Sequence, residues 1–367
     1  MKATRITLVG FGLLAGSIAV AIKSANQHIA IRAVSSKETL QKAKELSMAD
    51  DFFEYGDVQN WLPNSDLILL CGPIKHILST LEVLKSNAEL LNGKMAVVSD
   101  IGSTKELICE KGFALPEPFV FVGGHPMAGS EKHGIENGDP SIFENTYWLY
   151  CLQDKIKELP ESLNELLSFL GSQPVQISPQ EHDVAMAWLS HAPQLISTSM
   201  ATGLFLNITE KHLHLAGRGF RDMTRIAGSS WNMWKDILET NRQNAAGALA
   251  AYAEKILEIK NALSDEQFDK LEDNFLRGNK TRYDLERGKN LAYPLYEVIA
   301  QIPDKPGSIL EALNPLAEKN INIRDIELMK VREGIGGTLL LAFKTENEAK
   351  TAIELLEDKG IYAKRRV

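Results

Sequence analysis

Cysteines and long apolar runs are scarce in this sequence, and its 40 basic residues are outnumbered by 48 acidic ones; each of these features argues against a class of protein. The 367 residues include only three cysteines, Cys71, Cys109 and Cys151, and no CxxC pair, so neither a disulfide framework nor a zinc site is expected. No apolar run is long enough to span a bilayer. The formal net charge is −8, which argues against nonspecific nucleic-acid binding.

The N-terminus also lacks the features of a secretory signal. The sequence MKATRITLVGFG enters an apolar strand pattern directly, and glycines interrupt the apolar stretch before any cleavage signature. With 44% hydrophobic and 24% charged residues, the composition is that of an ordinary globular protein. We therefore expect a cytoplasmic protein of two or three domains that binds no membrane.

A glycine turn follows the first strand pattern. Residues 6–25 show a β-branched run, a turn and an apolar helical pattern, and Gly10, Gly12 and Ala15 form a GxGxxA motif. The first glycine permits the tight turn, the second lets a pyrophosphate approach the backbone, and the helix N-terminus offers unpaired N–H groups. The alternative is a glycine turn in another kind of α/β protein. The residues expected at the cofactor are Gly10, Phe11, Gly12, Leu13 and Leu14.

Strand patterns alternate with helical patterns through the first third of the chain. The strand patterns lie at 29–36, 65–73, 95–103 and 119–126. This alternation predicts βαβ units and a doubly wound Rossmann sheet, in which ligands bind beyond the carboxyl ends of the strands. Four residues are expected there, lining one crevice: Gly72, Pro73, Ser103 and His125.

The end of the second strand pattern leaves the choice of cofactor open. An NAD site usually has an acidic residue there for the ribose hydroxyl, whereas this chain has Ser35, Ser36 and Lys37. Hydroxyls and a lysine suit the 2′-phosphate of NADP. Alternatively, Lys37 only begins a solvated helix.

The segment 123–134, GGHPMAGSEKHG, carries the strongest signal of chemistry. Its two glycines allow a close backbone approach, and His125 has an ordinary pKa of about 6.5, which suits a general base. Ser130 and Glu131 add a hydroxyl and a carboxylate. The alternative is a polar surface turn, but the position of His125 at a strand end favours function.

Helical periodicity replaces the alternating pattern after Pro174. Residues 181–205 and about 240–275 show no strand signal, which predicts an all-helical domain and a boundary near residue 176. His191 follows His182 by nine residues, which is about 180° around a continuous helix. The two rings are therefore expected on different faces, and no metal pair is predicted.

Arginines crowd the segment 216–236, which is unusual in an acidic chain. Arg218, Arg221 and Arg225 precede Trp231 and Trp234. Guanidinium groups bind carboxylates in a bidentate manner, so an anionic ligand is expected. For at least one of the three arginines we expect instead a surface ion pair.

The last part of the chain has its own pattern after a charged helix end and linker at 275–290. It reads strand (295–302), helix (308–319), strand (321–330), strand (337–344), helix and strand. This βαββαβ order predicts a ferredoxin-like domain and resembles the ACT domain, an amino-acid-sensing module. The alternative is a structural or dimerising module. The resemblance implies effector contacts at Asp304, Pro306, Gly307, Asn320, Asn322 and Ile323.

Five segments together resemble the prephenate dehydrogenase family, which performs the oxidative step of tyrosine biosynthesis. They are VGFGLLAGS (9–17), DIGSTK (100–105), GGHPMAGSEKHG (123–134), WLSHAPQ (188–194) and RGFRDMTRIAGSS (218–230). In that family, the histidine that matches His125 interacts with the C4 hydroxyl of the substrate. The serine that matches Ser103 positions that hydroxyl and the nicotinamide. The resemblance also implies a substrate pocket with Ser130, Glu131, His191, Arg225 and Trp234.

The resemblance implies an architecture and a reaction. The expected domains are a dinucleotide-binding domain (1–176), a helical substrate and dimerisation domain (177–290) and an ACT regulatory domain (293–367). The expected enzyme is a homodimer that needs no metal and oxidatively decarboxylates prephenate with NAD, under feedback by tyrosine. NADP, arogenate as substrate, another hydroxy-acid dehydrogenase and a non-catalytic sensor are the alternatives.

Overall fold

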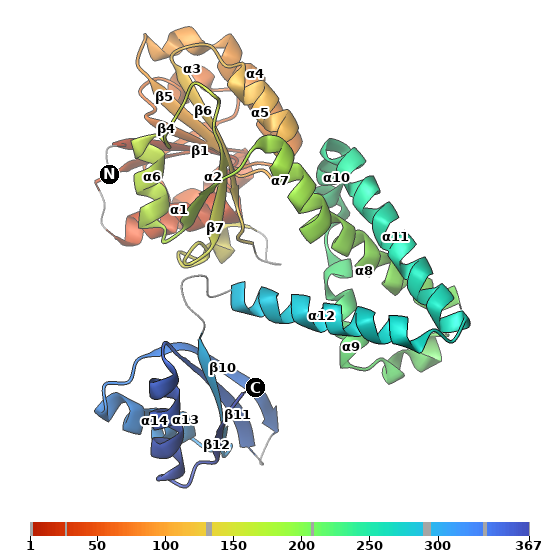
Figure 1. Cartoon of the computed structure of the whole chain (residues 1–367). Helices are drawn as coiled ribbons and strands as arrows, with labels where there is room; N and C mark the ends of the chain where they lie inside the picture. Colours follow the sequence, from red (N-terminus) through yellow and green to blue (C-terminus); the bar gives the residue numbers. More distant parts are fainter. Residues whose placement is uncertain are drawn as a thin grey trace. The chain divides into compact units, whose positions relative to one another are not determined.

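The computed structural model describes residues 3–25, 28–129, 134–206, 209–288, 295–332 and 336–366. The chain forms two compact units, Met1–Lys255 and Ile256–Val367 (Figure 1). Among the described residues, no helix combines the length and apolar character needed to cross a membrane.

An eight-stranded sheet forms the centre of the first unit. The strand order is β3-β2-β1-β4-β5-β6-β7-β8. Pairs from β3 to β6 are parallel, β7 is antiparallel to β6, and β8 is parallel to β7. The predicted doubly wound sheet is therefore present, with β3, β7 and β8 as additions that the sequence did not predict. The strands are β1 (Arg5–Val9), β2 (Ala30–Ser35), β3 (Asp51–Glu54), β4 (Leu67–Leu70), β5 (Ala96–Asp100), β6 (Phe119–Pro126), β7 (Tyr147–Cys151) and β8 (Gln173–Gln176).

Helices cover both faces of this sheet, and a separate apolar core fills each interface (Figure 1). One face packs against α1 (Leu13–Ser24), α2 (Lys37–Glu45) and α6 (Glu161–Phe169). The other face packs against α3 (Val58–Trp61), α4 (Ile74–Ser86) and α5 (Glu106–Phe113). Burial on both faces explains why β4 reads LILL, an apolar run without polar alternation.

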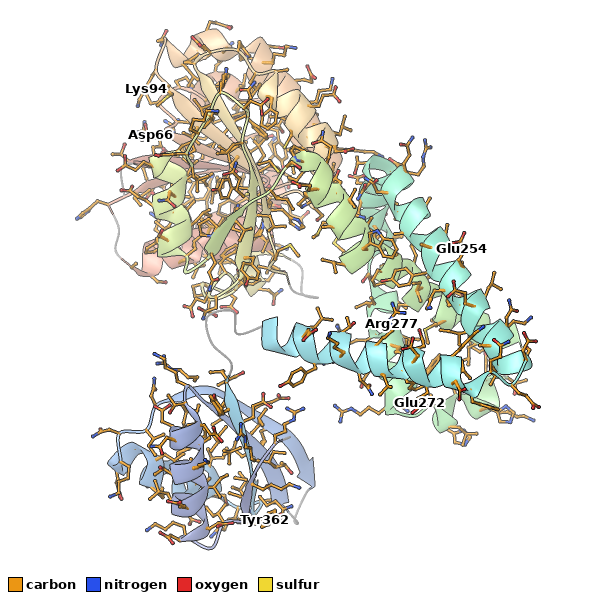
Figure 2. All side chains as sticks on the ribbon, in the orientation of Figure 1. Asp66, Lys94, Glu254, Glu272, Arg277 and Tyr362 are labelled. Atoms are coloured by element: carbon orange, nitrogen blue, oxygen red, sulfur yellow. The ribbon has the colours of Figure 1, made fainter. Side chains whose placement is uncertain are left out.

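Asp66 ties together the amino ends of β1 and β4, at the edge of the sheet opposite the carboxyl ends. Its Oδ2 accepts hydrogen bonds from the backbone N–H groups of Thr4 and Arg5, each at 2.9 Å. Lys94 pairs with Oδ1 at 3.0 Å (Figure 2). These contacts set the position of β1 relative to β4, and therefore the position of the loops that follow the two strands.

A helical region follows the sheet, as predicted. Ser178 caps α7 through a reciprocal capping box with Glu181, and Pro179 occupies the first helical turn. The described elements are α7 (Pro179–Met186), the π-helical turn η3 (Ala187–His191), α8 (Ala192–Gly203), η4 (Leu204–Leu206), η5 (Glu210–Leu215), α9 (Arg218–Thr224), η6 (Arg225–Gly228), α10 (Trp231–Thr240) and α11 (Arg242–Ser264).

The second unit contains α12 (Phe268–Gly288) and a small antiparallel sheet. The helix continues to Gly288, so most of the predicted linker at 275–290 is helical. The sheet has the order β10-β11-β9-β12, and its chain order is the predicted βαββαβ. Its elements are β9 (Tyr296–Ile302), α13 (Ser308–Glu318), β10 (Ile323–Arg332), β11 (Gly336–Phe343), α14 (Glu346–Glu357) and β12 (Ala363–Arg365).

Candidate active site

The glycine turn after β1 has the geometry of a phosphate cradle. Gly10 has φ +90°, and a Cβ there would lie 2.6 Å from the backbone nitrogen of Gly72. A Cβ on Gly12 would meet nothing within 4 Å, so its backbone is open to a ligand. No side chain caps the N-terminus of α1. Phe11 is buried in the core, so only its backbone is available to a cofactor. A dinucleotide pyrophosphate therefore fits this turn.

The hydroxyls after β2 already have local roles. Ser36 caps α2, its Oγ accepting from the backbone N–H of Thr39 at 3.4 Å. Ser35 is buried, with its Oγ 3.5 Å from the hydroxyl of Tyr55. Lys37 is exposed and pairs with Glu54 at 3.6 Å. A lysine and a carboxylate thus stand side by side where the ribose of a dinucleotide is expected.

Gly123 and Gly124 on β6 allow close packing inside the protein. A Cβ on Gly123 would lie 2.5 Å from the Sγ of Cys109. A Cβ on Gly124 would lie 2.4 Å from the carbonyl oxygen of Asp100. The groups that approach these two glycines closely are therefore other residues of the protein, from α5 and β5. This close packing places His125 next to β5.

A buried ion pair organises the ends of β5 and β6. The ammonium group of Lys105 contacts Oδ2 of Asp100, and both side chains are fully buried. Oδ2 also accepts from the N–H of Gly102 at 2.8 Å, and Oδ1 from that of Gly124 at 3.0 Å. Ser103 lies between Gly102 and Lys105 and is half-buried. Asp100 thus holds the segment with Ser103 and the strand with His125.

His125 is the first of three side chains that are linked by hydrogen bonds. Its Nδ1 lies 2.8 Å from Nε2 of His182, and Nδ1 of His182 lies 2.8 Å from Oδ1 of Asp183. His182 and Asp183 on α7 are fully buried, whereas His125 is partly exposed. Asp183 also accepts from the N–H groups of Lys105 at 2.6 Å and Glu106 at 3.0 Å. The helical region is therefore joined to the sheet next to His125.

His191 lies in the same cluster. Asn241 donates from Nδ2 to the carbonyl of Asp183 at 2.7 Å, and the same nitrogen lies 3.2 Å from Nδ1 of His191. The ring of Trp234 meets that of His191 edge to face, with centroids 5.8 Å apart. The indole N–H of Trp234 is buried and has no hydrogen-bond partner within the described ranges.

The prediction that His182 and His191 lie on different faces assumed one continuous α-helix, and that assumption is wrong. A π-helical turn, Ala187–His191, lies between them. Such a turn is wider than an α-helical turn and changes the direction of every later side chain. His182 contacts His125 directly, and His191 is joined to Asp183 through Asn241.

Burial sets the protonation of these histidines. It lowers the pKa of His125 well below its ordinary value, and His182, Lys105 and His191 lower it further. Burial also lowers the pKa of His182, against the opposing effect of Asp183. Burial lowers the pKa of His191 to about 4. His125 is therefore neutral at pH 7, the state that a general base requires.

The lowered pKa of His191 predicts a loss of stability in acid. The unfolded chain takes up a proton near pH 6.5 but the folded chain only near pH 4, so stability present above pH 6.5 is lost as the pH falls toward 4. This one residue should account for about 2–3 kcal/mol between pH 7.5 and pH 4.5. Urea unfolding at both pH values should show a smaller difference for His191→Gln than for wild type. An equal difference would contradict this prediction.

The three arginines differ in their surroundings. Arg218 pairs with Asp222 on its own helix at 3.3 Å, which is the expected surface ion pair. Arg221 donates from Nε to the carbonyl of Ala216 at 3.1 Å. Arg225 is exposed on η6. Its neighbour Ile226 accepts a hydrogen bond from the side chain of Gln194 at 2.8 Å, one helical turn beyond His191.

The remaining predicted residues are distributed as follows. Gly72 and Pro73 connect β4 to α4 beside the glycine turn. Ser130 and Glu131 lie outside the described residues. In the second unit, Gly307 caps α13 with φ +90° and Asn320 has φ +53°. Around them lie the other predicted effector residues, Asp304 and Pro306 before α13 and Asn322 and Ile323 at the start of β10.

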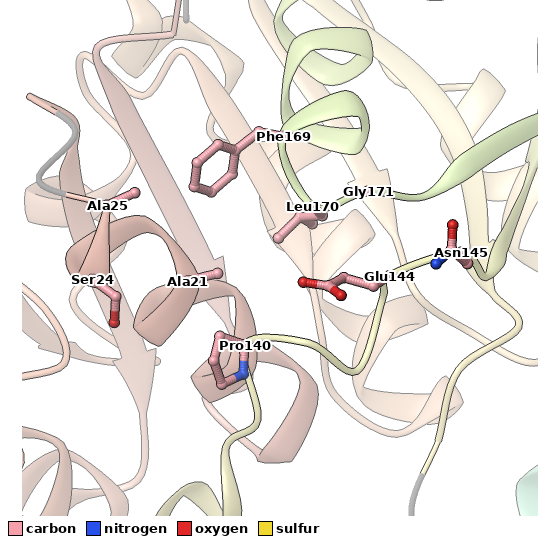
Figure 3. A pocket seen from close by; sticks show the side chains of 9 residues that line it. All are labelled: Ala21, Ser24, Ala25, Pro140, Glu144, Asn145, Phe169, Leu170 and Gly171. Atoms are coloured by element: carbon pink, nitrogen blue, oxygen red, sulfur yellow. The ribbon is translucent and has the colours of Figure 1, made fainter. Parts of the chain in front are cut away.

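A surface hollow of about 510 Å³ lies elsewhere, against the C-terminal end of α1 and the end of α6 (Figure 3). It is lined by Ala21, Phe169 and Glu144 among others. None of the predicted catalytic or binding residues lines it, so its location does not coincide with the candidate site.

Sequence reasoning missed four residues of this site: Asp100, Lys105, His182 and Asp183. A local signal existed for His182 and Asp183. They are two adjacent polar side chains one turn after the capped start of a helix at Ser178. No local signal indicated that Asp100 and Lys105 form a buried pair.

A doubly wound sheet, an open glycine turn and a neutral histidine at a strand end define a nucleotide-binding protein equipped for acid–base chemistry. The nucleotide-binding domain model of prephenate dehydrogenase matches residues 18–178, and the dimerization domain model matches residues 178–277. Together these models cover more than half of the chain, which belongs to the prephenate dehydrogenase family.

Individual relatives agree with this assignment. Prephenate dehydrogenase of Bacillus subtilis is 32% identical over 375 residues, covering 99% of this chain and 98% of the relative. The Aquifex aeolicus prephenate dehydrogenase, solved with hydroxyphenyl propionate and NAD+, has a TM-score of 0.69 at 25% identity, covering 78% and 99%. Arogenate dehydrogenase of Synechocystis has a TM-score of 0.64 at 26% identity, covering 77% and 99%.

Proposed function

We propose that this chain is a prephenate dehydrogenase that uses NAD to convert prephenate to 4-hydroxyphenylpyruvate and CO2. Family membership, the full-length likeness to the Bacillus subtilis enzyme and the likeness to the NAD+ complex from Aquifex aeolicus support this proposal. The observation that carries it is the position of His125, partly exposed at the carboxyl end of β6 and in contact with the buried pair His182 and Asp183.

The cofactor site follows the strand ends. The open backbone at Gly12 and the uncapped start of α1 suit the pyrophosphate. NAD, when bound, accepts the hydride from C4 of the substrate. The residues proposed to hold it are Gly10, Phe11, Gly12, Leu13, Leu14, Ser35, Ser36, Gly72 and Pro73.

The chain itself supplies a base, a positioning hydroxyl and positive charge. His125 removes the proton of the C4 hydroxyl as C4 loses its hydride, while Ser103 orients that hydroxyl. The C1–carboxylate bond breaks and CO2 leaves. The electron pair of that bond completes the aromatic ring, and the C4 oxygen takes back the proton from His125 to give the phenol. Aromatisation makes the overall step favourable, so position and charge are what the protein must provide.

The proposed substrate pocket combines His191, Trp234, Arg225, Ser130 and Glu131. The buried indole N–H of Trp234 supports a role as donor to a substrate oxygen, because a buried donor without a partner is costly.

The test of the whole proposal is turnover of prephenate and arogenate, each with NAD and with NADP. Absence of turnover in all four assays would rule out the proposed enzyme and leave another hydroxy-acid dehydrogenase or the non-catalytic sensor.

Arg225→Ala is expected to raise the KM for prephenate about 10–100-fold with a much smaller change in kcat. The reason is the loss of a charge-assisted hydrogen bond to a substrate carboxylate, about 1.5–3 kcal/mol. Arg218→Ala is the matched control, since its exposed ion pair lies within its own helix. Steady-state kinetics decides, and an unaltered KM for Arg225→Ala would exclude carboxylate binding by this residue.

We further propose a homodimer assembled through the helical domain. Large apolar side chains are exposed along α11 and α12, including Leu257, Leu263 and Phe275 at 58%, 59% and 72%. Burial of such side chains in a partner interface would be strongly favourable. Sedimentation equilibrium tests this, with a dimer mass as the expected result.

The C-terminal unit is proposed to be an ACT domain that binds tyrosine, with boundaries of 1–176, 177–290 and 293–367 for the three domains. The βαββαβ order and the left-handed Gly307 and Asn320 at the loop ends support a ligand site there. Its residues would be Asp304, Pro306, Gly307, Asn320, Asn322 and Ile323. Deletion of 293–367 should abolish inhibition by tyrosine, and persistent inhibition would place the effector elsewhere.

A cytoplasmic location is also proposed, consistent with three free cysteines.

A further inference from the structure

His125 is linked by hydrogen bonds to side chains on α7, and these bonds bear on its protonation as well as on its position. His125, His182 and Asp183 are linked by two contacts of 2.8 Å each. The first contact joins residues 57 positions apart, from β6 and α7. A chain of hydrogen bonds that ends in a carboxylate has a direction, and that direction determines which nitrogen of His125 carries a proton.

The direction is set at the Asp183 end. Oδ1 accepts from the backbone N–H of Lys105 at 2.6 Å, and Oδ2 accepts from that of Glu106 at 3.0 Å. Backbone N–H groups can only donate, so both carboxylate oxygens act as acceptors. The contact of Oδ1 with Nδ1 of His182 must therefore use a proton on the histidine.

The rest of the chain follows from the valence of imidazole. Burial keeps His182 neutral, and a neutral ring carries one N–H. With that proton on Nδ1, Nε2 of His182 has a lone pair and accepts. The contact at 2.8 Å with Nδ1 of His125 therefore places a proton on Nδ1 of His125. Nε2 of His125 is then left with its lone pair.

We propose that His182 and Asp183 are positioning residues that hold His125 in the Nδ1–H tautomer and so leave Nε2 to accept the C4 hydroxyl proton. This inference rests on the proposed function of His125 as the base. After the transfer, Nδ1–H of His125 still donates to His182, so the positive ring remains hydrogen-bonded. Other charged or titratable groups near these rings are Lys105, Asp100 and His191.

The first test is spectroscopic and independent of turnover. Nitrogen-15 labelling of histidine in the full chain, with NMR detection of ring nitrogens at neutral pH, reports the tautomer of each ring. The His125 signals are assigned by their disappearance in His125→Asn. The expected result is a protonated Nδ1 and an unprotonated Nε2. The opposite tautomer in the wild-type protein would overturn the proposal.

Asp183→Ala provides the sharpest perturbation. Without the carboxylate, the proton of His182 is no longer held on Nδ1, so both directions of the contact between His182 and His125 become available. We expect the NMR signals of His125 to report a mixture of the two tautomers and kcat to fall about 10–100-fold. A pure Nδ1–H tautomer together with unchanged kcat would overturn the proposal.

Two variants of His182 separate positioning from packing. His182→Gln keeps one donor and one acceptor, whereas His182→Phe keeps neither. We expect kcat to fall about 10–100-fold in His182→Phe, as for outer-shell partners of other functional histidines. The KM for prephenate should change less than twofold, and His182→Gln should retain most of the activity. Equal losses in both variants would indicate packing alone and overturn the proposal.

Glu181→Gln is the matched control. It lies next to His182 on α7, is exposed, and keeps the capping box because glutamine serves at that position. Its kcat should equal that of wild type. Inactive wild-type protein would refute the proposed function, whereas active wild type with an unaffected His182→Phe variant would refute only this inference.

Discussion

Replacing His125 with asparagine is expected to lower kcat for prephenate by about 10²–10⁴-fold, the usual contribution of a general base. Asparagine has no titratable nitrogen, so the proton of the C4 hydroxyl must leave to solvent. His125 lies at the end of β6, which β4 and β5 separate from β1 and its glycine turn, so the Kd for NAD should change little. Steady-state formation of NADH measures the first effect, and fluorescence titration measures the second.

The pH profile provides the control for this prediction. Because burial lowers the pKa of His125, wild-type kcat/KM should stay constant from neutral pH to below 6.5. It should fall only as the pH decreases through the lowered pKa. The residual activity of His125→Asn should lack that acid limb. Turnover equal to wild type in His125→Asn would remove this residue from the mechanism.

Lys105→Met is expected to cost about 3–5 kcal/mol of unfolding free energy, the largest stability effect that this structure predicts. Lys105 and Asp100 are both fully buried, and the ammonium group is the cationic partner of that carboxylate. Methionine has a similar volume but leaves the carboxylate without its counter-charge. A loss of this size is a large part of the stability of a typical domain. Urea unfolding at neutral pH measures it.

The matched control removes both charges together. In Asp100→Asn/Lys105→Met, the amide oxygen still accepts a hydrogen bond from the backbone of Gly102 or Gly124, but no buried charge remains unpaired. This double variant should recover most of the stability lost in Lys105→Met. If the double variant is as unstable as Lys105→Met, packing and not charge explains the effect.

Much of the architecture could be predicted because it depends on local patterns. The glycine turn at Gly10 and Gly12, the buried run of β4 and the βαββαβ order of the last part each follow from residues close together in the chain. The strands β3, β7 and β8 were missed, because they have four or five residues each and pair through distant neighbours. The predicted role of Gly123 and Gly124 was incomplete, because their neighbours come from other elements.

The π-helical turn that ends at His191 could not be predicted from the sequence either. Its five residues, AWLSH, have no sequence feature that separates them from an α-helix. The turn nevertheless changes where His191 points relative to His182. The expectation of different faces holds only for a continuous α-helix, and the π-helical turn removes that premise. In the folded chain His182 contacts His125, and Asn241 joins His191 to Asp183.

Residue types and short spacings in the chain are sufficient to predict the family likeness, the order of the elements and His125 as the candidate base. They do not predict that His182 and Asp183 are hydrogen-bonded in series to His125, or that Lys105 is the counter-charge of Asp100. Those contacts join residues from different strands and helices, and their chemistry follows from burial and hydrogen-bond direction, which exist only once the elements have packed.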